Sequence, residues 1–122
     1  MTSVTSARHD WTQLAELPPV VIASSIVPGS QDVPSSTAEI SVTFSKVMRT
    51  DSFSVVIWKL EAFPQLEGNP TFNNEGRTVV LKVRLAPATT YAIWLNSDRF
   101  ANFRDTEGHP AVPYLVSFRT AP

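Results

Sequence analysis

The sequence contains no cysteine, only two histidines and four glycines, and its formal net charge is −1. Without cysteine, a disulfide scaffold, a thiolate zinc site and a cysteine nucleophile are excluded. The near-zero charge provides no basic field for nucleic acid or for an anionic membrane. No apolar run approaches the roughly 18 residues of a membrane span, and the N-terminus lacks the pattern of a signal peptide. We therefore expect no nucleic-acid partner and no membrane insertion.

What the chain does contain is enough apolar sequence for one domain. It has 122 residues, of which 43% are hydrophobic, so it can bury a core. Residues 1–18 are polar and rich in serine and threonine, and they predict a linker or flexible segment. Within them, "DWTQLAEL" favours one or two helical turns with Asp10 as the cap. The folded domain is expected to span residues 19–122.

From residue 20 onward the pattern is that of short strands separated by turns. The turn segments are rich in proline, and nearly all ten prolines fall in them, where no ladder hydrogen bond is lost. About seven strands at the spacing of an antiparallel sandwich are predicted. They cover residues 20–24, 38–44, 53–60, 71–73, 77–85, 91–96 and 114–120. No long helical pattern interrupts them, so the fold class is an all-β, Ig-like antiparallel β-sandwich.

Alternation within the late strands assigns side chains to the two faces of the sheets. In "TVVLKVRL" the predicted inward set is Val79, Leu81, Val83 and Leu85, and the outward set is Val80, Lys82 and Arg84. In "YAIWLN" the inward set is Tyr91, Ile93 and Leu95, and the other face carries Ala92, Trp94 and Asn96. In the last strand, Tyr114, Val116 and Phe118 share one face.

One structural motif is more specific than this alternation. "LAPATTY" places Tyr91 at the start of a late strand, directly after a turn that contains Pro87. A tyrosine corner needs this arrangement, in which the phenol is hydrogen-bonded to backbone a few residues upstream. The alternative is that Tyr91 is simply an aromatic residue of the core.

Three further stretches together resemble a known family. "SSIVPGSQDVPSSTAEISVTFSKVM", "GRTVVLKVRLAPATTYAIWL" and "RDTEGHPAVPYLVSFRT" are similar, in this order, to the bacterial Ig-like domains of the SbsA type. The resemblance spans about residues 19–120, with Ala88 in place of the usual glycine after the Leu-x-Pro proline. It implies a non-catalytic module of a larger bacterial protein, at the cell surface or in the envelope, with neighbouring domains as partners and no cofactor.

The residues for catalysis are nearly missing. A hydrolytic triad needs a nucleophile, a base and an orienting acid. The only candidate bases of the histidine type are His9, in the predicted linker, and His109, and no GxSxG motif accompanies them. We therefore expect that the protein is not an enzyme.

"NFRDTEGHPAVPY" is the one stretch that raises the question of a metal site. Asp98, Asp105, Glu107 and His109 provide oxygen and nitrogen ligands that suit calcium, zinc or copper. However, "DTEGHP" lacks the alternating ligands of an EF-hand loop. Turn chemistry explains the same residues, with Asp105 accepting hydrogen bonds in an Asx turn and Gly108 supplying a positive φ. We prefer the turn, with Phe100, Phe103 and Tyr114 holding the loop against the core.

A binding face is the third candidate site. Trp94 is predicted on the outside of its strand, and Trp58 lies in the strand run at residues 53–60. If the two strands are neighbours, the indoles would form an aromatic patch that stacks on a polysaccharide or anchors a protein partner. The alternative is that Trp11, Leu14 or an adjacent domain covers this patch. The cations Lys82, Arg84, Arg99 and Arg104 are expected to be ordinary solvated residues.

Overall fold

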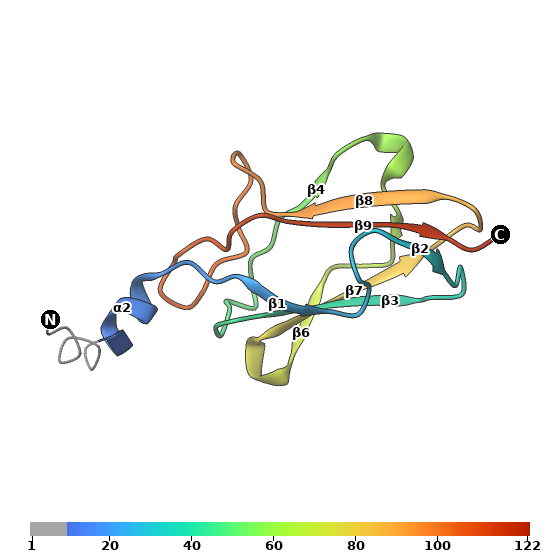
Figure 1. The fold of residues 1–122 in the computed structure, drawn as a ribbon. Coiled ribbons are helices and arrows are strands. Elements are labelled where there is room, and N and C mark those ends of the chain that lie inside the picture. The colour runs from blue at the N-terminus through green and yellow to red at the C-terminus, as the bar shows by residue number, and fades with distance from the viewer. Residues whose placement is uncertain (1–9) are drawn as a thin grey trace, which may run out of the picture.

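The structure, a computed structural model, describes residues 10–122, with side chains from residue 13 onward. Two sheets pack face to face, and a short helix extends from one end (Figure 1). The first sheet contains β1 (Val21–Ser24), β3 (Glu39–Phe44), β7 (Thr78–Arg84), β5 (Gln65–Leu66) and β6 (Thr71–Asn73). The second contains β2 (Ser30–Val33), β9 (Tyr114–Thr120), β8 (Thr90–Leu95) and β4 (Val55–Ile57). The helix is α2 (Asp10–Glu16), and the 3₁₀ turns are η1 (Leu60–Ala62) and η2 (Asn74–Gly76).

The predicted all-β sandwich is confirmed, but the described residues 10–122 form nine strands rather than about seven. The additional strands, β2 and β5, lie in stretches that were predicted as a turn and a loop. The strand predicted at residues 53–60 is shorter, because the chain bends after Ile57 and then forms η1. The expectation of a purely antiparallel sandwich is wrong for one pair, since β2 runs parallel to β9. The other strand pairs are antiparallel.

The core lies between the two sheets and uses the inward sets predicted from β7, β8 and β9. Ile93, Val79 and Val116 are completely buried, and Phe44 and Phe103 close one end of the core with ring centroids 5.7 Å apart. In β3, the alternating residues Ile40, Val42 and Phe44 also face the core and are fully buried. A core of seventeen buried residues connects the two layers, which explains why alternation was a reliable signal here.

Three residues predicted on an outer face are buried instead, and one of them is Ala92, 5% exposed in β8. Val80 is only 9% exposed, because β7 is flanked at this position by Ser41 of β3 and Thr71 of β6. Asn96 is fully buried just beyond the end of β8, where the chain takes a positive φ of 68° and leaves the strand geometry. Its side chain is therefore not part of an outer face.

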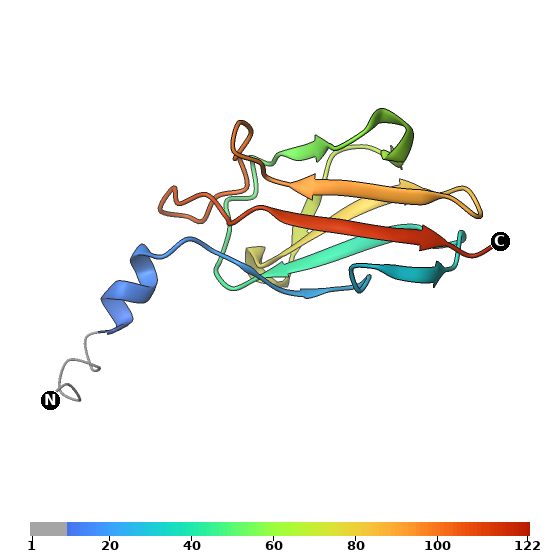
Figure 2. The ribbon, with the colours of Figure 1, turned by 45° about the horizontal axis from the view of Figure 1, so that its top comes forward.

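The two ends of the described chain lie at opposite ends of the sandwich. Figures 1 and 2 show α2 at one end and Pro122 at the other. Of the predicted linker at residues 1–18, residues 1–9 and the role of His9 lie outside the described residues, and α2 occupies residues 10–16. The predicted capping by Asp10 lies outside the described side chains. None of the described helices is long and apolar enough to cross a membrane.

Candidate functional site

The loop at residues 102–114 is organised around one buried carboxylate. Asp105 is 1% exposed, and its Oδ1 accepts hydrogen bonds from the backbone N–H groups of Glu107 and His109, both at 2.9 Å. Gly108 has a φ of 94°, and its N–H donates to the backbone carbonyl of Asp105. The turn therefore closes on the Asp105 side chain, and Gly108 occupies the position where a left-handed conformation is required.

Two side chains complete the surroundings of Asp105. The Lys46 Nζ lies 2.6 Å from Oδ2, and the Nδ1 of His109 lies 2.9 Å from the same oxygen. Burial alone raises the pKa of the Asp105 carboxyl, but the hydrogen bonds from Lys46, His109 and Glu107 outweigh it and lower this pKa to about 2. The carboxylate is thus ionised across the physiological pH range and holds together three segments of the chain.

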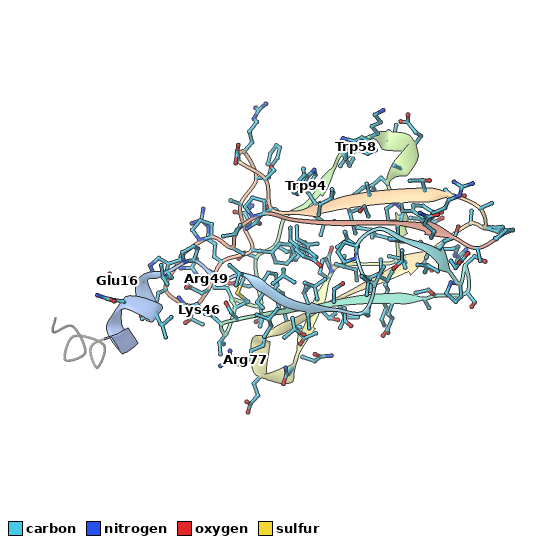
Figure 3. The ribbon with its side chains drawn as sticks, in the orientation of Figure 1. Glu16, Lys46, Arg49, Trp58, Arg77 and Trp94 are labelled. Carbon is cyan, nitrogen blue, oxygen red and sulfur yellow. The ribbon has the colours of Figure 1, made fainter. Side chains whose placement is uncertain are left out.

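Lys46 extends this network to the N-terminal helix. Its ammonium donates to the backbone carbonyls of Ala15 and Leu17, both at 2.9 Å. These carbonyls end α2, where unsatisfied acceptors favour a cation. Figure 3 shows Lys46 beside Glu16 at this end of the molecule. Lys46 therefore joins α2, the end of β3 and the loop at residues 102–114.

The residues considered for metal binding are only partly brought together. Asp105 and His109 are in contact, but Glu107 contributes its backbone N–H and leaves its side chain exposed. Across residues 10–122, no group of three or more His, Asp or Glu side chains is arranged to hold a metal ion. Both oxygens of Asp105 are already engaged. The turn, rather than a metal site, stays the prediction for this loop, and calorimetry with calcium, zinc and copper tests the metal alternative.

Sequence reasoning missed the residue that attaches this loop to the core. Asn96 donates from Nδ2 to the carbonyls of Phe103 and Ala111, and its Oδ1 accepts from the Phe103 N–H, all within 3.0 Å. Phe103 is fully buried as expected, but Phe100 is 54% exposed and does not hold the loop against the core. An Asn directly after an apolar strand was the available signal, since asparagine tolerates positive φ.

The turn between β7 and β8 contains the second predicted structural motif. The Ala86 N–H donates to the Tyr91 hydroxyl at 2.8 Å, five residues upstream of the ring. Tyr91 packs on Phe118 with ring centroids 5.5 Å apart, and the Pro87 carbonyl accepts from the Thr89 hydroxyl. This is the geometry of a tyrosine corner, and it fixes the turn at the end of the sandwich opposite α2.

The predicted aromatic face is only partly assembled. Trp94 lies half-buried on the outer side of β8, and Trp58, 54% exposed, follows the neighbouring strand β4 (Figure 3). Val56 is opposite Trp94 in the ladder. The described aromatic rings that pack in pairs do not include these two indoles. Leu14 was one of the residues that could cover the patch, but it is itself 57% exposed. The side chain of Trp11 is not among the described side chains.

His109 makes no contact of a catalytic kind among the described residues. Its ring nitrogen contacts Asp105, and no hydrogen bond joins the ring to a serine or threonine hydroxyl. The imidazole and the carboxylate therefore form part of the loop's internal network rather than a base beside a nucleophile.

Two packed sheets, a tyrosine corner and an end loop closed by a buried Asn and Asp define an Ig-like β-sandwich. Residues 15–120 match the family described as bacterial Ig-like domain, and the chain belongs to this family. The resemblance found in the sequence is therefore confirmed. No curated protein sequence matches the chain.

Several solved structures share the fold. The S-layer protein rSbsC(31-844) superposes with a TM-score of 0.58 at 17% identity, over 98% of this chain and 16% of that one. The N-terminal part of the bacterial S-layer protein SbsC gives a TM-score of 0.57 at 18% identity, over 97% of this chain and 27% of that one. CopC from Methylosinus trichosporium OB3b gives a TM-score of 0.56 at 13% identity, over 85% of this chain and 94% of that one. This chain thus spans about one sixth of the first of these proteins.

Proposed function

We propose that this domain is a non-catalytic module of a larger extracellular or envelope protein, where it spaces or docks neighbouring domains. The observation that supports this role is the position of the chain ends. The chain arrives through α2 at one end of the sandwich and leaves at Pro122 at the other, so flanking domains would be held apart along its long axis (Figure 2).

The network around Asp105 supports the same proposal. A spacer transmits orientation only if the incoming segment is fixed to the sandwich. Lys46 bonds the end of α2, and the Val112 N–H donates to the Pro19 carbonyl. The S-layer structures that share this fold are several times longer than this chain, which fits a module used as one unit of a larger protein.

The test is to insert the domain between two fluorescent reporters and to measure their energy transfer in single molecules. A rigid spacer gives one narrow distribution of transfer efficiency. A glycine–serine linker with the same number of residues is the control, because it behaves as a random coil. A distribution as broad as that of the flexible linker would contradict the proposal.

A second candidate function is carbohydrate binding by Trp58 and Trp94. The observation that favours it is that both indoles lie on one side of the β4–β8 pair, with Trp58 largely exposed. An exposed indole stacks readily on an apolar ligand face. Titration with a panel of soluble polysaccharides, followed by tryptophan fluorescence and by the melting temperature, tests it. Binding would raise the melting temperature by mass action and be lost in Trp58→Ala. A flat response across the panel excludes this function.

A further inference from the structure

The strand β4 forms a free edge of the second sheet, whose order is β2-β9-β8-β4. The Asn96 N–H donates to the Ser54 carbonyl at 3.0 Å, so Ser54 and Asn96 form a hydrogen-bonded pair. The next pair along the ladder is Val55 and Leu95. In an antiparallel ladder, hydrogen-bonded and non-hydrogen-bonded pairs alternate. The Val56–Trp94 pair is therefore hydrogen-bonded, and the backbone N–H and C=O groups of Val55 and Ile57 point away from β8.

These outward backbone groups have no partner in the part of the chain that the structure describes. Among the described residues, no turn, loop or side chain donates to or accepts from the backbone of Val55 or Ile57 on this side. A shallow groove of about 380 Å³ follows the edge, and it is lined by Ser54, Val55, Val56, Ile57 and Phe100. Ile57 and Phe100 are about half exposed. The edge thus has the unpaired backbone and the apolar walls that an added strand requires.

A cation lies at each end of this edge. Beyond Ile57, the Lys59 ammonium lies 4.8 Å from the Trp58 ring centroid. At the other end, Arg99 lies 5.8 Å from the ring centroid of Phe100. The loop carrying Phe100 is fixed beside the start of β4, because the Asn102 N–H donates to the Ser54 hydroxyl at 3.0 Å.

These two cations have no ionic partner within the described part of the chain. The ion pairs found there involve Lys46, His109 and Arg84. Glu61 and Asp98 are near Lys59 and Arg99 in sequence, yet neither forms an ion pair with them. Both cations are therefore available to acidic groups of a partner.

We infer that the edge of β4 accepts an extended apolar segment of another protein, flanked at both ends by acidic residues. A second copy of this chain fits less well. If two β4 edges paired antiparallel, Lys59 of one copy would meet Arg99 of the other, and parallel pairing would place like residues together. Like charges oppose each other in both arrangements. This inference rests on the proposed function and specifies how the module docks.

The test uses the whole chain with synthetic peptides of alternating valine and threonine. One peptide carries two glutamates at each end, and a matched control carries two lysines at each end. We expect the backbone amide NMR signals of Val55 and Ile57 to shift with the acidic peptide. Its affinity should be at least about tenfold higher than that of the basic peptide and should fall with added salt.

The variant Ile57→Pro removes an outward N–H without removing a bond to β8, so it should abolish peptide binding while the sheet persists. Ile57→Thr keeps the N–H and is the matched control. The double variant Lys59→Glu, Arg99→Glu should reverse the preference for the flanking charge. No amide shift with either peptide, equal affinity for both, or a dimer of the free chain that Ile57→Pro dissociates would overturn the inference. A negative peptide result together with a narrow reporter distribution would reject this docking mode and leave the spacer role intact.

Discussion

Asp105 is the residue on which the α2 end of the domain depends. In the folded protein its pKa of about 2 lies below the ordinary aspartate value of 3.8. A depressed pKa adds stability that is fully present above about pH 4 and is lost as the pH falls toward 2. The shift corresponds to about 2 kcal/mol in the free energy of unfolding. Denaturant titrations between pH 7 and pH 2 should show this loss in the wild-type chain.

The variant Asp105→Asn provides the comparison for that titration. Its amide oxygen can still accept from the backbone N–H groups of Glu107 and His109, but its NH₂ group would face the Lys46 ammonium. We expect a less stable protein at pH 7, by about 2–4 kcal/mol, and a flatter pH dependence below pH 4. An unchanged slope below pH 4 would show that other carboxylates cause the loss.

Ala88 is a second residue whose substitution should change the free energy of unfolding. It takes a φ of 52°, at the position where the resemblance to the SbsA-type domains implies a glycine. A Cβ in the left-handed region costs about 1 kcal/mol. Ala88→Gly should therefore raise the free energy of unfolding by about 0.5 kcal/mol, since the greater freedom of the unfolded chain offsets part of the gain.

The matched control for this change is Ala23→Gly in the exposed part of β1, which should lower stability because strand interiors disfavour glycine. Chemical denaturation of both variants gives the comparison. A loss of stability in Ala88→Gly as large as in Ala23→Gly would contradict the explanation by backbone strain.

At the scale of elements, alternation predicted the strands that carry the core, because side chains facing it have a period of two. β3, β7, β8 and β9 follow this rule. β2 was missed because its four residues, "SQDV", have no alternating apolar pattern, and its partner β9 is remote in the sequence. β5 was missed because it has two residues. These strands exist through tertiary pairing, which no local pattern contains.

In the candidate sites too, contacts between residues close in sequence were predictable, and contacts between distant segments were not. The turn chemistry of Asp105 and Gly108, and the proline turn before Tyr91, involve residues close in sequence and were therefore predictable. The bond from Lys46 to Asp105 spans 59 positions and has no local signal. The free edge at Val55 and Ile57 depends on the register of β4 against β8, which also cannot be derived from either strand alone.

The attachment of α2 gives a prediction at this scale. Lys46→Met removes the donor to the Ala15 and Leu17 carbonyls and leaves the buried Asp105 with His109 as its remaining side-chain partner. We expect the free energy of unfolding to fall by about 2–4 kcal/mol. Hydrogen exchange should become faster at the Leu17 amide and in the loop at residues 102–114. In β7 and β8, exchange should change only as much as the global stability does. Lys46→Arg, which retains the charge, should lose less. Unchanged exchange at Leu17 would mean that α2 is held by other contacts.

For the whole molecule, we predict that the parallel pairing of β2 and β9 bears the load when the chain ends are pulled apart. The Gly29 N–H donates to the Ser117 carbonyl and the Ala121 N–H donates to the Val33 carbonyl. Pulling the chain ends apart moves β2 and β9 in opposite directions along their length, so these bonds are loaded together. Pulling between Pro122 and the neighbouring turn at Pro87 instead opens the antiparallel β8–β9 pair one bond at a time.

Single-molecule stretching can compare the two directions, because the chain has no native cysteine and Pro87→Cys provides a unique attachment point. We expect a higher unfolding force between the chain ends than between residues 87 and 122. Ala121→Pro removes the N–H that bonds Val33 and should lower only the first force, whereas Ala121→Gly keeps the N–H and should preserve most of it. Equal forces in the two directions would show that the β2–β9 pair does not bear the load, and the spacer role would then rest on rigidity without resistance to tension.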